Sequence, residues 1–155
     1  RDFAERLPAF LGDGTQIRQL LKNVIANAMD AVGDGGGDIR LSTRVAHCDR
    51  TYLESTHETL RLSLTQPLAE GDYVFLEVTD SGCGMDTETE RRMFDPFFST
   101  KSLGRGLGAA AVLGIVRGHG GALKVESQVG RGTTFTVLFP ARTASDRSDS
   151  APTGS

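Results

Sequence analysis

The sequence predicts an α+β domain in which helices pack on one face of a mixed sheet. Two segments, near residues 13–32 and 107–119, carry apolar residues at the three- or four-residue spacing of a helix. Several shorter runs alternate apolar and polar residues, as strands with one buried face do. The chain has 155 residues, of which 38% are hydrophobic and 24% are charged, so it can bury the core of one soluble domain.

The first helix is predicted to start at Asp13 and to end at the glycine-rich residues 33–37. Asp13 can cap the helix, with Gln16 three residues further on, and the glycines can terminate it. Its apolar residues at helical spacing are Ile17, Leu20, Leu21, Val24, Ile25, Ala28 and Val32. Asn23 and Asn27 lie on a different stripe, and because they are four residues apart their side chains should point the same way.

Strands are predicted around residues 39–45, 60–64 and 74–78, where apolar residues alternate with polar ones. The polar stretch between residues 48 and 59 is expected to connect the first two of these strands at the surface. A final hairpin is predicted from the two alternating runs that flank a turn at residues 129–132. These runs contain Leu123, Val125, Phe135, Val137 and Phe139.

Residues 85–108 have little regular pattern, yet they include a group of aromatic side chains. We therefore expect a lid that has its own hydrophobic anchor, formed by Phe94, Phe97 and Phe98. The second helix follows at residues 107–119.

The charge argues against a nucleic-acid partner, and the hydrophobic pattern argues against a membrane-spanning segment. The formal net charge is -3 and no long basic stretch occurs, which argues against nucleic-acid binding. No apolar run approaches the roughly 18 residues that a membrane-spanning helix needs, and the first residues lack the apolar core of a signal peptide. Cys48 and Cys83 are far apart and are expected to be free thiols in a reducing compartment. We therefore expect a cytoplasmic domain, although a parent protein could be anchored to a membrane elsewhere.

The run Asp80–Met85 places one carboxylate at the end of a predicted strand, in a turn that contains Gly82 and Gly84. Such a carboxylate can accept a hydrogen bond from the exocyclic amine of adenine, and glycines let a purine ring approach the backbone. Guanine has a carbonyl where adenine has this amine, so Asp80 favours adenine. Asp-Ser-Gly is also an ordinary turn sequence, so the run alone does not decide the function.

Asn23 and Asn27 are suited to holding a metal ion. Carboxamide oxygens can complete the shell of Mg²⁺, which prefers oxygen ligands and keeps several waters beside nucleotide phosphates. The same two residues could equally be polar surface on an amphipathic helix.

A further group of glycines, Gly104, Gly106 and Gly108, opens the second helix, whose first N–H groups can bind an anion. The run lacks the Lys-Ser/Thr ending of a P-loop and does not follow a strand that opens a βαβ unit, so neither the Walker nor the Rossmann pattern applies. Lys101 and Arg105 could contact terminal phosphates or remain in solvent. Together, the three groups outline receptors for the metal, the base and the phosphates of ATP.

In residues and in order, these groups resemble the motifs of the ATP-binding catalytic domain of sensor histidine kinases, within the Bergerat-fold ATPase superfamily. The similar segments are residues 20–28 for the N box, 80–85 for the G1 box, 94–101 for the F box, 104–108 for the G2 box and 130–135 for the closing glycine–threonine motif. Residues 96–101 and 114–121 look most like the nitrogen-regulation-type and hybrid branches.

The resemblance implies a two-layer α/β sandwich over residues 13–140, with ATP and Mg²⁺ as ligands under a flexible lid. Residues 1–12 would end a linker from a dimerisation domain that this chain lacks, and residues 141–155 would be a flexible tail or linker. The residues implied in nucleotide binding are Asn27, Asp80, Gly82, Gly84, Met85, Lys101, Gly104, Arg105, Gly106, Leu107, Gly108 and Thr133. Asn27 would ligate Mg²⁺ with Asn23 beside it, and Asp80 would bind the adenine amine with support from Thr133 through a water molecule.

The resemblance also implies a protein-histidine kinase. The hydrolytic branches, which include gyrase, mismatch-repair and chaperone ATPases, use a Glu four residues before the metal-binding Asn. This chain has Asn23 there, and an amide cannot serve as a general base. With Asn23 and Lys101 as catalytic residues, the domain would transfer the γ-phosphoryl group of ATP to a histidine on the dimerisation domain, and a response-regulator receiver domain would accept it next. His57 lies after the N box, beside a strand pattern, so it is not expected to be the acceptor.

Two positions depart from the family pattern. Ala109 stands where the family usually has Leu, and Asp30 stands where many members have Lys or Arg. These departures leave open a degenerate domain that acts as a docking module, and a Bergerat-fold ATPase is a further alternative.

Overall fold

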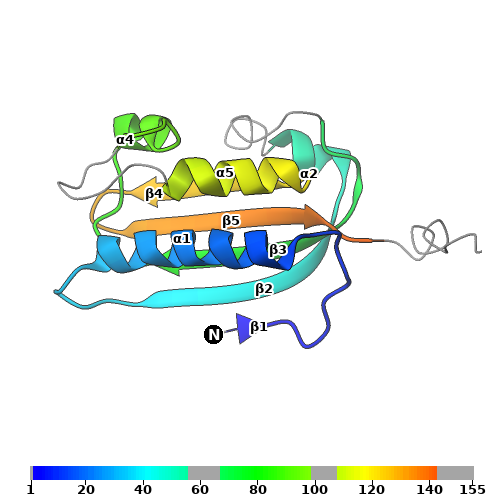
Figure 1. Ribbon diagram of the computed structural model, residues 1–155, viewed down its shortest axis with the longest axis horizontal. Helices are drawn as coiled ribbons and strands as arrows, with labels where there is room; N and C mark the ends of the chain where they lie inside the picture. Colours follow the sequence, from blue (N-terminus) through cyan, green and yellow to red (C-terminus); the bar gives the residue numbers. More distant parts are fainter. Residues whose placement is uncertain (1, 56–66, 99–107, 143–155) are drawn as a thin grey trace, which may run out of the picture.

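The structure, a computed structural model, describes residues 2–55, 67–98 and 108–142, which form a sheet with helices on both of its faces (Figure 1). In chain order the elements are β1 (Asp2–Phe3), α1 (Gly14–Val32), β2 (Ile39–Cys48), α2 (Arg50–Ser55), β3 (Gly71–Asp80), α4 (Thr87–Arg92), α5 (Gly108–Gly118), β4 (Ala122–Gln128) and β5 (Gly132–Pro140).

The sheet has the strand order β1-β2-β3-β5-β4. β1 runs parallel to β2, and the other neighbouring pairs are antiparallel. The register sets Asp80 opposite Ile39 on one side and opposite Thr133 on the other, so the end of β3 lies between the starts of β2 and β5. The mixed, mainly antiparallel sheet predicted from the sequence is confirmed.

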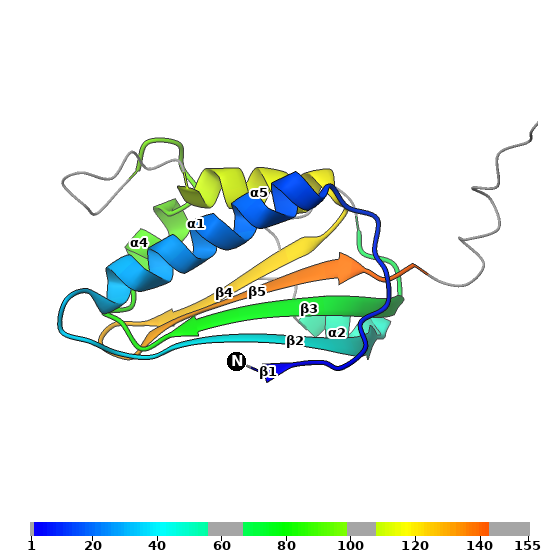
Figure 2. The ribbon, with the colours of Figure 1, turned by 60° about the horizontal axis from the view of Figure 1, so that its bottom comes forward.

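Helices α1 and α5 lie side by side over one face of the sheet (Figure 2). α1 packs against β3 and β5, and α5 packs against β4. The most buried side chains between the two layers are Leu20, Val24, Val112, Val116, Val137 and Phe139. Each such side chain contributes roughly 1.5–3 kcal/mol relative to exposure in water, so this interface is the main source of stability. In the part of the chain that the structure describes, no helix is long and apolar enough to cross a membrane.

Helix α1 begins and ends where the sequence predicted. Asp13 Oδ1 accepts hydrogen bonds from the backbone N–H groups of Thr15 at 2.8 Å and Gln16 at 3.2 Å. At the other end Gly33 has a φ of 63°, which glycine adopts without strain, and its N–H donates to the Met29 carbonyl at 3.0 Å. The amide-bearing stripe of α1 is therefore held at a defined position along the sheet.

The opposite face of the sheet is partly covered by α2, which corrects two expectations. The stretch between residues 48 and 59 was predicted to be only a connection, and the helices were predicted to share one face. Leu53 of α2, 8% exposed, packs in a second cluster with Cys48, Tyr73, Phe75, Ala122 and Leu138. Tyr73 and Phe75 alternate along β3 with the side chains that face α1, so they need a cover of their own. The predicted strand at residues 60–64 lies outside the described residues.

Helix α4 corrects the expectation of irregular structure within residues 85–108. Its six residues are all polar, so no apolar period marks it in the sequence. Asp86 caps the helix by accepting a hydrogen bond from the Thr89 N–H at 2.8 Å, and this bond lowers the pKa of the Asp86 carboxyl group. Met93, 9% exposed, then joins the end of α4 to the main core.

Two of the three aromatic residues predicted to anchor a lid are packed, and the third is not. Phe94 packs against the main core, and the Arg92 guanidinium lies 4.4 Å above the ring centroid of Phe98. Phe97 is 77% exposed, with a φ of 68° that is unusual for a residue other than glycine. The expectation that Phe97 helps to anchor a lid is therefore wrong in this structure, because its ring meets solvent.

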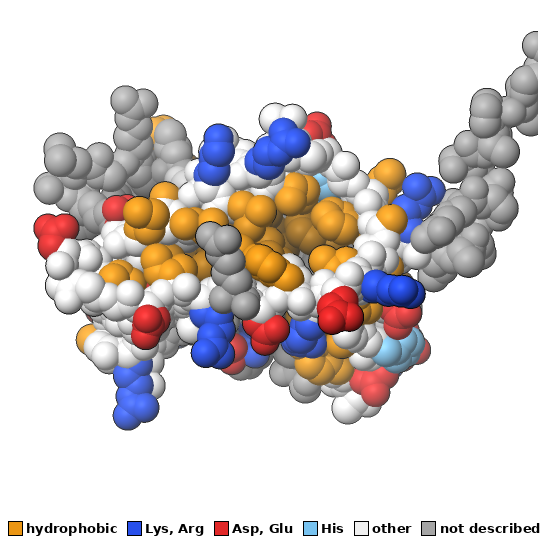
Figure 3. Space-filling view, turned by 90° about the horizontal axis from the view of Figure 1, so that it is seen from below, with side chains coloured by type: hydrophobic (Ala, Val, Ile, Leu, Met, Phe, Trp, Pro, Cys, Tyr) orange, Lys and Arg blue, Asp and Glu red, His pale blue; other side chains and the backbone are white. Residues whose placement is uncertain are grey.

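The helix-facing side of β2 is only partly covered, because Leu41 packs against the main core while residues at both ends of the strand are exposed. Ile39 and Val45 share this side with Leu41 and are 38% and 39% exposed. Figure 3, seen from the side of β1 and β2, shows apolar side chains gathered between α1 and this edge of the sheet. An apolar surface therefore faces solvent on the side away from α5.

Candidate functional site

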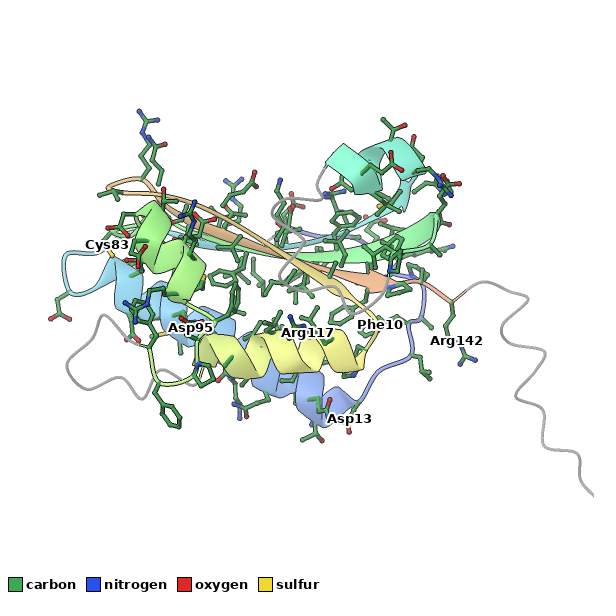
Figure 4. The ribbon with its side chains drawn as sticks, turned by 90° about the horizontal axis from the view of Figure 1, so that it is seen from above. Phe10, Asp13, Cys83, Asp95, Arg117 and Arg142 are labelled. Atoms are coloured by element: carbon green, nitrogen blue, oxygen red, sulfur yellow. The ribbon has the colours of Figure 1, made fainter. Side chains whose placement is uncertain are left out.

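Asp80 and Thr133 lie side by side at one end of the sheet. Asp80 ends β3, Thr133 is its direct partner near the start of β5, and the two residues are 4% and 5% exposed. Direct cross-strand partners point to the same face, and the alternation along both strands places this pair on the side covered by α1. Figure 4 shows Cys83, in the loop that follows Asp80, at one end of the helical layer and Asp13 at the other end.

The Asp80 carboxylate is held by one of its two oxygens. Oδ1 accepts a hydrogen bond from the Gly82 N–H at 2.9 Å. Oδ2 has no hydrogen-bond partner among residues 2–55, 67–98 and 108–142, and no deeply buried polar side-chain atom in these ranges lacks one. Oδ2 therefore reaches accessible space and can accept a hydrogen bond from a ligand.

The loop after Asp80 is clamped between the end of α1 and the β4–β5 turn. The Cys83 N–H donates to the Ala31 carbonyl at 3.0 Å, and the Gly130 N–H donates to the Cys83 carbonyl at 2.7 Å. A Cβ atom on Gly82 would collide with the backbone of Ala31, and one on Gly84 would collide with the Gln128 carbonyl.

The two glycines are thus required by the packing of backbone on backbone. From the sequence alone, these glycines were expected to let a purine ring approach the backbone. The structure gives a nearer cause, because the protein itself already occupies the space that a side chain would need.

Ser127 also lies at this site, although no sequence pattern predicted it. Its Oγ accepts a hydrogen bond from the Met85 N–H at 2.8 Å and lies 2.8 Å from Thr133 Oγ1. Its hydroxyl also reaches the Gly132 carbonyl at 3.2 Å. The observed loop is one residue shorter than the predicted turn at residues 129–132, because Gln128 pairs with Gly132, and this register sets Ser127 directly opposite Thr133. The predicted four-residue turn would have set Ser127 opposite Thr134, so no signal in the sequence predicted this contact.

Asn23 and Asn27 are both half-buried on α1. Asn23 Oδ1 accepts a hydrogen bond from the Gln19 side chain at 3.0 Å. Asn27 Oδ1 would lie 3.8 Å from a Cβ built on Gly108, so the Asn27 amide faces the first residue of α5. The carboxamide oxygen of Asn27 is of the ligand type that Mg²⁺ prefers, and the nearby N-terminus of α5 is suited to a phosphate group.

The adenine and metal parts of the predicted site are joined through α1. Ala31, which contacts the Asp80 loop, is four residues beyond Asn27, and this spacing corresponds to roughly 6 Å along the helix axis. Of the predicted phosphate loop only Gly108 is described. Lys101, Gly104, Arg105, Gly106 and Leu107 lie outside the described residues.

A separate depression lies between α1 and α5, but it contains none of the predicted site residues. Its volume is about 400 Å³, and it is lined by Thr15, Gln16, Gln19, Ala111, Gly114 and Ile115. None of these lining residues carries a charge, whereas the Asp80 region offers a buried carboxylate, so the latter is the better candidate for a nucleotide site.

Comparison with known proteins places this geometry in a family. Residues 12–143 match the family model described as histidine kinase-, DNA gyrase B-, and HSP90-like ATPase. The chain belongs to this family. The family recognised from the sequence motifs is therefore confirmed.

The curated relatives are sensor kinases. The chain is 37% identical over 140 residues to the sensor kinase CckA of Brucella abortus, covering 88% of this chain and 14% of that protein. It is 38% identical over 136 residues to the sensory histidine kinase/phosphatase NtrB of Rhizobium meliloti, covering 87% of this chain and 33% of that protein. The chain thus spans a third or less of the length of these two relatives.

Solved structures share the fold. The nucleotide-free catalytic domain of the histidine kinase ThkA matches with a TM-score of 0.63 and 25% identity, over 90% of this chain and 77% of that domain. Full-length ShkA in complex with AMPPNP matches with the same score and identity, over 92% of this chain and 26% of that one. The predicted α+β sandwich is confirmed as the fold of histidine kinase catalytic domains, and this chain is a nucleotide-binding ATPase-family domain of the histidine kinase type.

Proposed function

We propose that this domain transfers the γ-phosphoryl group of ATP to a histidine on a dimerisation domain outside residues 1–155, and that a response-regulator receiver domain then accepts it. The catalytic domain would comprise residues 13–140 and would lie in the cytoplasm. One observation carries it: the Asp80–Thr133 pair is buried, intact and has an unoccupied acceptor in a domain of this family.

Asp80 and Thr133 would bind the base. Oδ2 of Asp80 would accept a hydrogen bond from the adenine amine, and the Thr133 hydroxyl would support the base through a water molecule. The clamped loop of Gly82, Gly84 and Met85 would form one wall, since its hydrogen bonds to α1, β4 and the β4–β5 turn hold it in place. A preformed wall of this kind reduces the ordering cost of binding.

The metal and phosphates would lie between α1 and the start of α5. Asn27 would hold Mg²⁺ with its carboxamide oxygen, and the ion would neutralise phosphate charge during transfer. The residues from Gly104 to Gly108 would surround the phosphates, with Arg105 and Leu107 among them and Lys101 contacting the terminal phosphate.

Asn23 separates the kinase proposal from hydrolysis. An amide cannot remove a proton from water at neutral pH, so rapid hydrolysis is disfavoured. The Gln19 side chain donates a hydrogen bond to Asn23 Oδ1, which fixes the orientation of the Asn23 amide. Phosphoryl transfer would then depend on positioning and charge.

The competing function is a docking module that no longer binds ATP, and the two departures from the family pattern favour it. Ala109 packs against the main core, where the usual Leu would fill more space, and Asp30 is exposed near the end of α1. Neither change removes Asp80, Thr133 or Asn27. The kinase proposal therefore has the better support.

Calorimetric titration with ATP, with and without Mg²⁺, and a phosphate-release assay on the same sample test the proposal. Binding that Mg²⁺ strengthens, with negligible release, is the expected result. Rapid release would identify an ATPase, and a folded chain that binds no nucleotide would be a docking module.

A further inference from the structure

The residues that lead into α1 are docked on the body of the domain, at the end of the sheet remote from the candidate site. We call residues 9–13 the strap. The Phe10 ring stacks on the Phe139 ring of β5, with 4.7 Å between the centroids and 4° between the planes. The Arg142 N–H donates to the Ala9 carbonyl at 2.8 Å. The strap is therefore held against the end of β5 by one ring and one backbone hydrogen bond.

His119, which follows α5, makes the third contact with the strap. Its Nε2 accepts a hydrogen bond from the Asp13 N–H at 3.0 Å, at the point where the strap becomes α1. Its ring also meets the Phe139 ring edge-on at 5.8 Å, and a Cβ built on Gly12 would lie 3.3 Å from His119 Cδ2. We propose that His119 is a pH-sensitive latch, which holds the strap while its ring is neutral and releases the strap when the ring is protonated.

Two backbone groups decide the tautomer of the His119 ring. The Asp13 N–H can only donate, so Nε2 must be the ring nitrogen without a hydrogen. The Ile115 carbonyl lies 2.7 Å from Nδ1 and can only accept, so Nδ1 must carry the hydrogen. Both hydrogen bonds are therefore made together only by the neutral ring.

Protonation would put a second hydrogen on Nε2, directly against the Asp13 N–H. Two donors would then face each other, and the hydrogen bond between the strap and His119 would be lost. Histidine side chains ordinarily take up a proton at about pH 6.5. The docked strap is therefore expected at pH 7.5, and its release is expected as the pH falls toward 5.5.

The charged groups around His119 leave this contact in control. In the part of the chain that the structure describes, the segments packed against the ring carry Asp13, Arg117 and Arg142, whereas Phe10 and Phe139 present neutral rings. Arg117 is two residues earlier on α5, roughly 200° around the helix axis. The Asp13 carboxylate already caps α1 through Oδ1. The two arginines disfavour a positive ring, and an imidazolium could turn to the carboxylate only by leaving the Asp13 N–H.

The latch gives the strap a regulatory meaning that rests on the proposed function. If residues 1–12 end a linker from the dimerisation domain, the docked strap fixes the direction in which this linker leaves the catalytic domain. Release of the strap would loosen the position of the nucleotide site relative to the acceptor histidine. Phosphoryl transfer in the longer protein would then fall in mild acid, although the nucleotide site itself is unchanged.

Nuclear magnetic resonance of the full chain tests the latch without any nucleotide. The ¹⁵N shifts of the His119 ring report its tautomer, and hydrogen exchange of the Asp13 amide, corrected for the intrinsic effect of pH, reports docking. We expect the Nδ1–H tautomer at pH 7.5. We also expect the protection of the Asp13 amide to fall by about tenfold for each pH unit below the titration of the ring, the limit for one coupled proton.

Matched variants separate the latch from other effects of acid. His119→Gln keeps an acceptor that cannot titrate, so the Asp13 amide should keep the same protection at pH 7.5 and 5.5. His119→Phe removes the acceptor and should give low protection at both values. His47→Gln changes an exposed histidine that lies 3.0 Å from Asp72, and it should leave the response to pH unchanged.

Three results would overturn the latch. One is an Nε2–H tautomer at pH 7.5, which can be measured even if the His119 variants do not fold. Another is an equal response to pH in His119→Gln and in the unchanged chain. The last is an equal loss of protection at the Val137 amide in the middle of β5, since acid would then unfold the whole domain.

ATP titration of the same samples at pH 7.5 keeps the two proposals apart. A folded chain that binds no ATP would remove the proposed function and leave the latch standing. ATP binding without a response of the strap to pH would remove the latch alone.

Discussion

Replacing Asp80 with asparagine should weaken ATP binding by roughly 10- to 150-fold. The substitution changes one oxygen into an NH₂ group and leaves the size of the side chain unchanged. Asparagine Oδ1 can still accept the 2.9 Å hydrogen bond from the Gly82 N–H, so the loop should keep its conformation. The NH₂ group would then take the place of Oδ2 and present a donor to the adenine amine, which is also a donor.

The magnitude follows from the kind of hydrogen bond that is lost. A hydrogen bond to a charged group contributes about 1.5–3 kcal/mol, and each 1.4 kcal/mol is a factor of ten in the dissociation constant. Because Asp80 is 4% exposed, solvent screens this bond little, and the upper half of the range is expected.

Calorimetry with three nucleotides isolates the effect. Purine riboside triphosphate has no amine, so its affinity should be nearly the same for the unchanged chain and for Asp80→Asn. GTP should lose less affinity than ATP, because the new NH₂ group can donate to the guanine carbonyl. Asp72→Asn, at the exposed opposite end of β3, is the matched control and should change none of the three affinities.

The reasoning would be refuted by one pattern in particular. If Asp80→Asn weakened ATP and purine riboside triphosphate by the same factor, Asp80 would act through the loop and not through the amine. Thermal unfolding of the variant, expected within a few degrees of the unchanged chain, shows whether the loop has been damaged.

Three further predictions concern the body of the domain. Val24→Ala, at a position 1% exposed in α1, should lower the free energy of unfolding by about 2–3 kcal/mol in denaturant titration, from two lost methyl groups and a residual cavity. Burial raises the pKa of the Cys48 thiol, whereas Cys83 is exposed. A disulfide reagent at pH 8 should therefore modify one thiol in the native chain and two in denaturant. Cys83→Ser should abolish the reaction of the native chain. His119 accepts a hydrogen bond from the Asp13 N–H at 3.0 Å and contacts the Ile115 carbonyl at 2.7 Å. His119→Phe should therefore lower the free energy of unfolding by about 1–3 kcal/mol in the same titration. An unchanged free energy of unfolding would show that water replaces these hydrogen bonds.

Long periodic elements could be predicted from the sequence, and short polar ones could not. α1 has two complete signals, an apolar stripe and a capping residue, and its observed start agrees with both. α2 and α4 have six residues each, too few for a period to show. What holds them is tertiary: Leu53 covers Tyr73 and Phe75, and Met93 joins the main core.

The candidate site shows the same division. Asp80 was found because a carboxylate at the end of an apolar strand is a local pattern. Ser127 was missed because its role exists only through strand register, which brings it opposite Thr133 and within reach of the Met85 N–H, 42 residues away in sequence. The glycines were found, but their cause was not, because a collision with Ala31 requires knowing where α1 ends.

In the site that we propose, the base-binding half and the metal-binding half would be built by different physical means. Asp80, Thr133 and Ser127 form a row of neighbours on three hydrogen-bonded strands. The relative positions of their Cα atoms are therefore set by the register of the sheet. Asn27 is placed by the packing of α1 against the sheet and by its proximity to Gly108. A one-residue slip of any one strand would turn its member of the row to the other face, whereas a small shift of α1 would move Asn27, the proposed metal ligand, alone. In the proposed site, recognition of the base would therefore depend on the paired strands of the sheet, and the position of the metal would depend on how α1 and α5 pack.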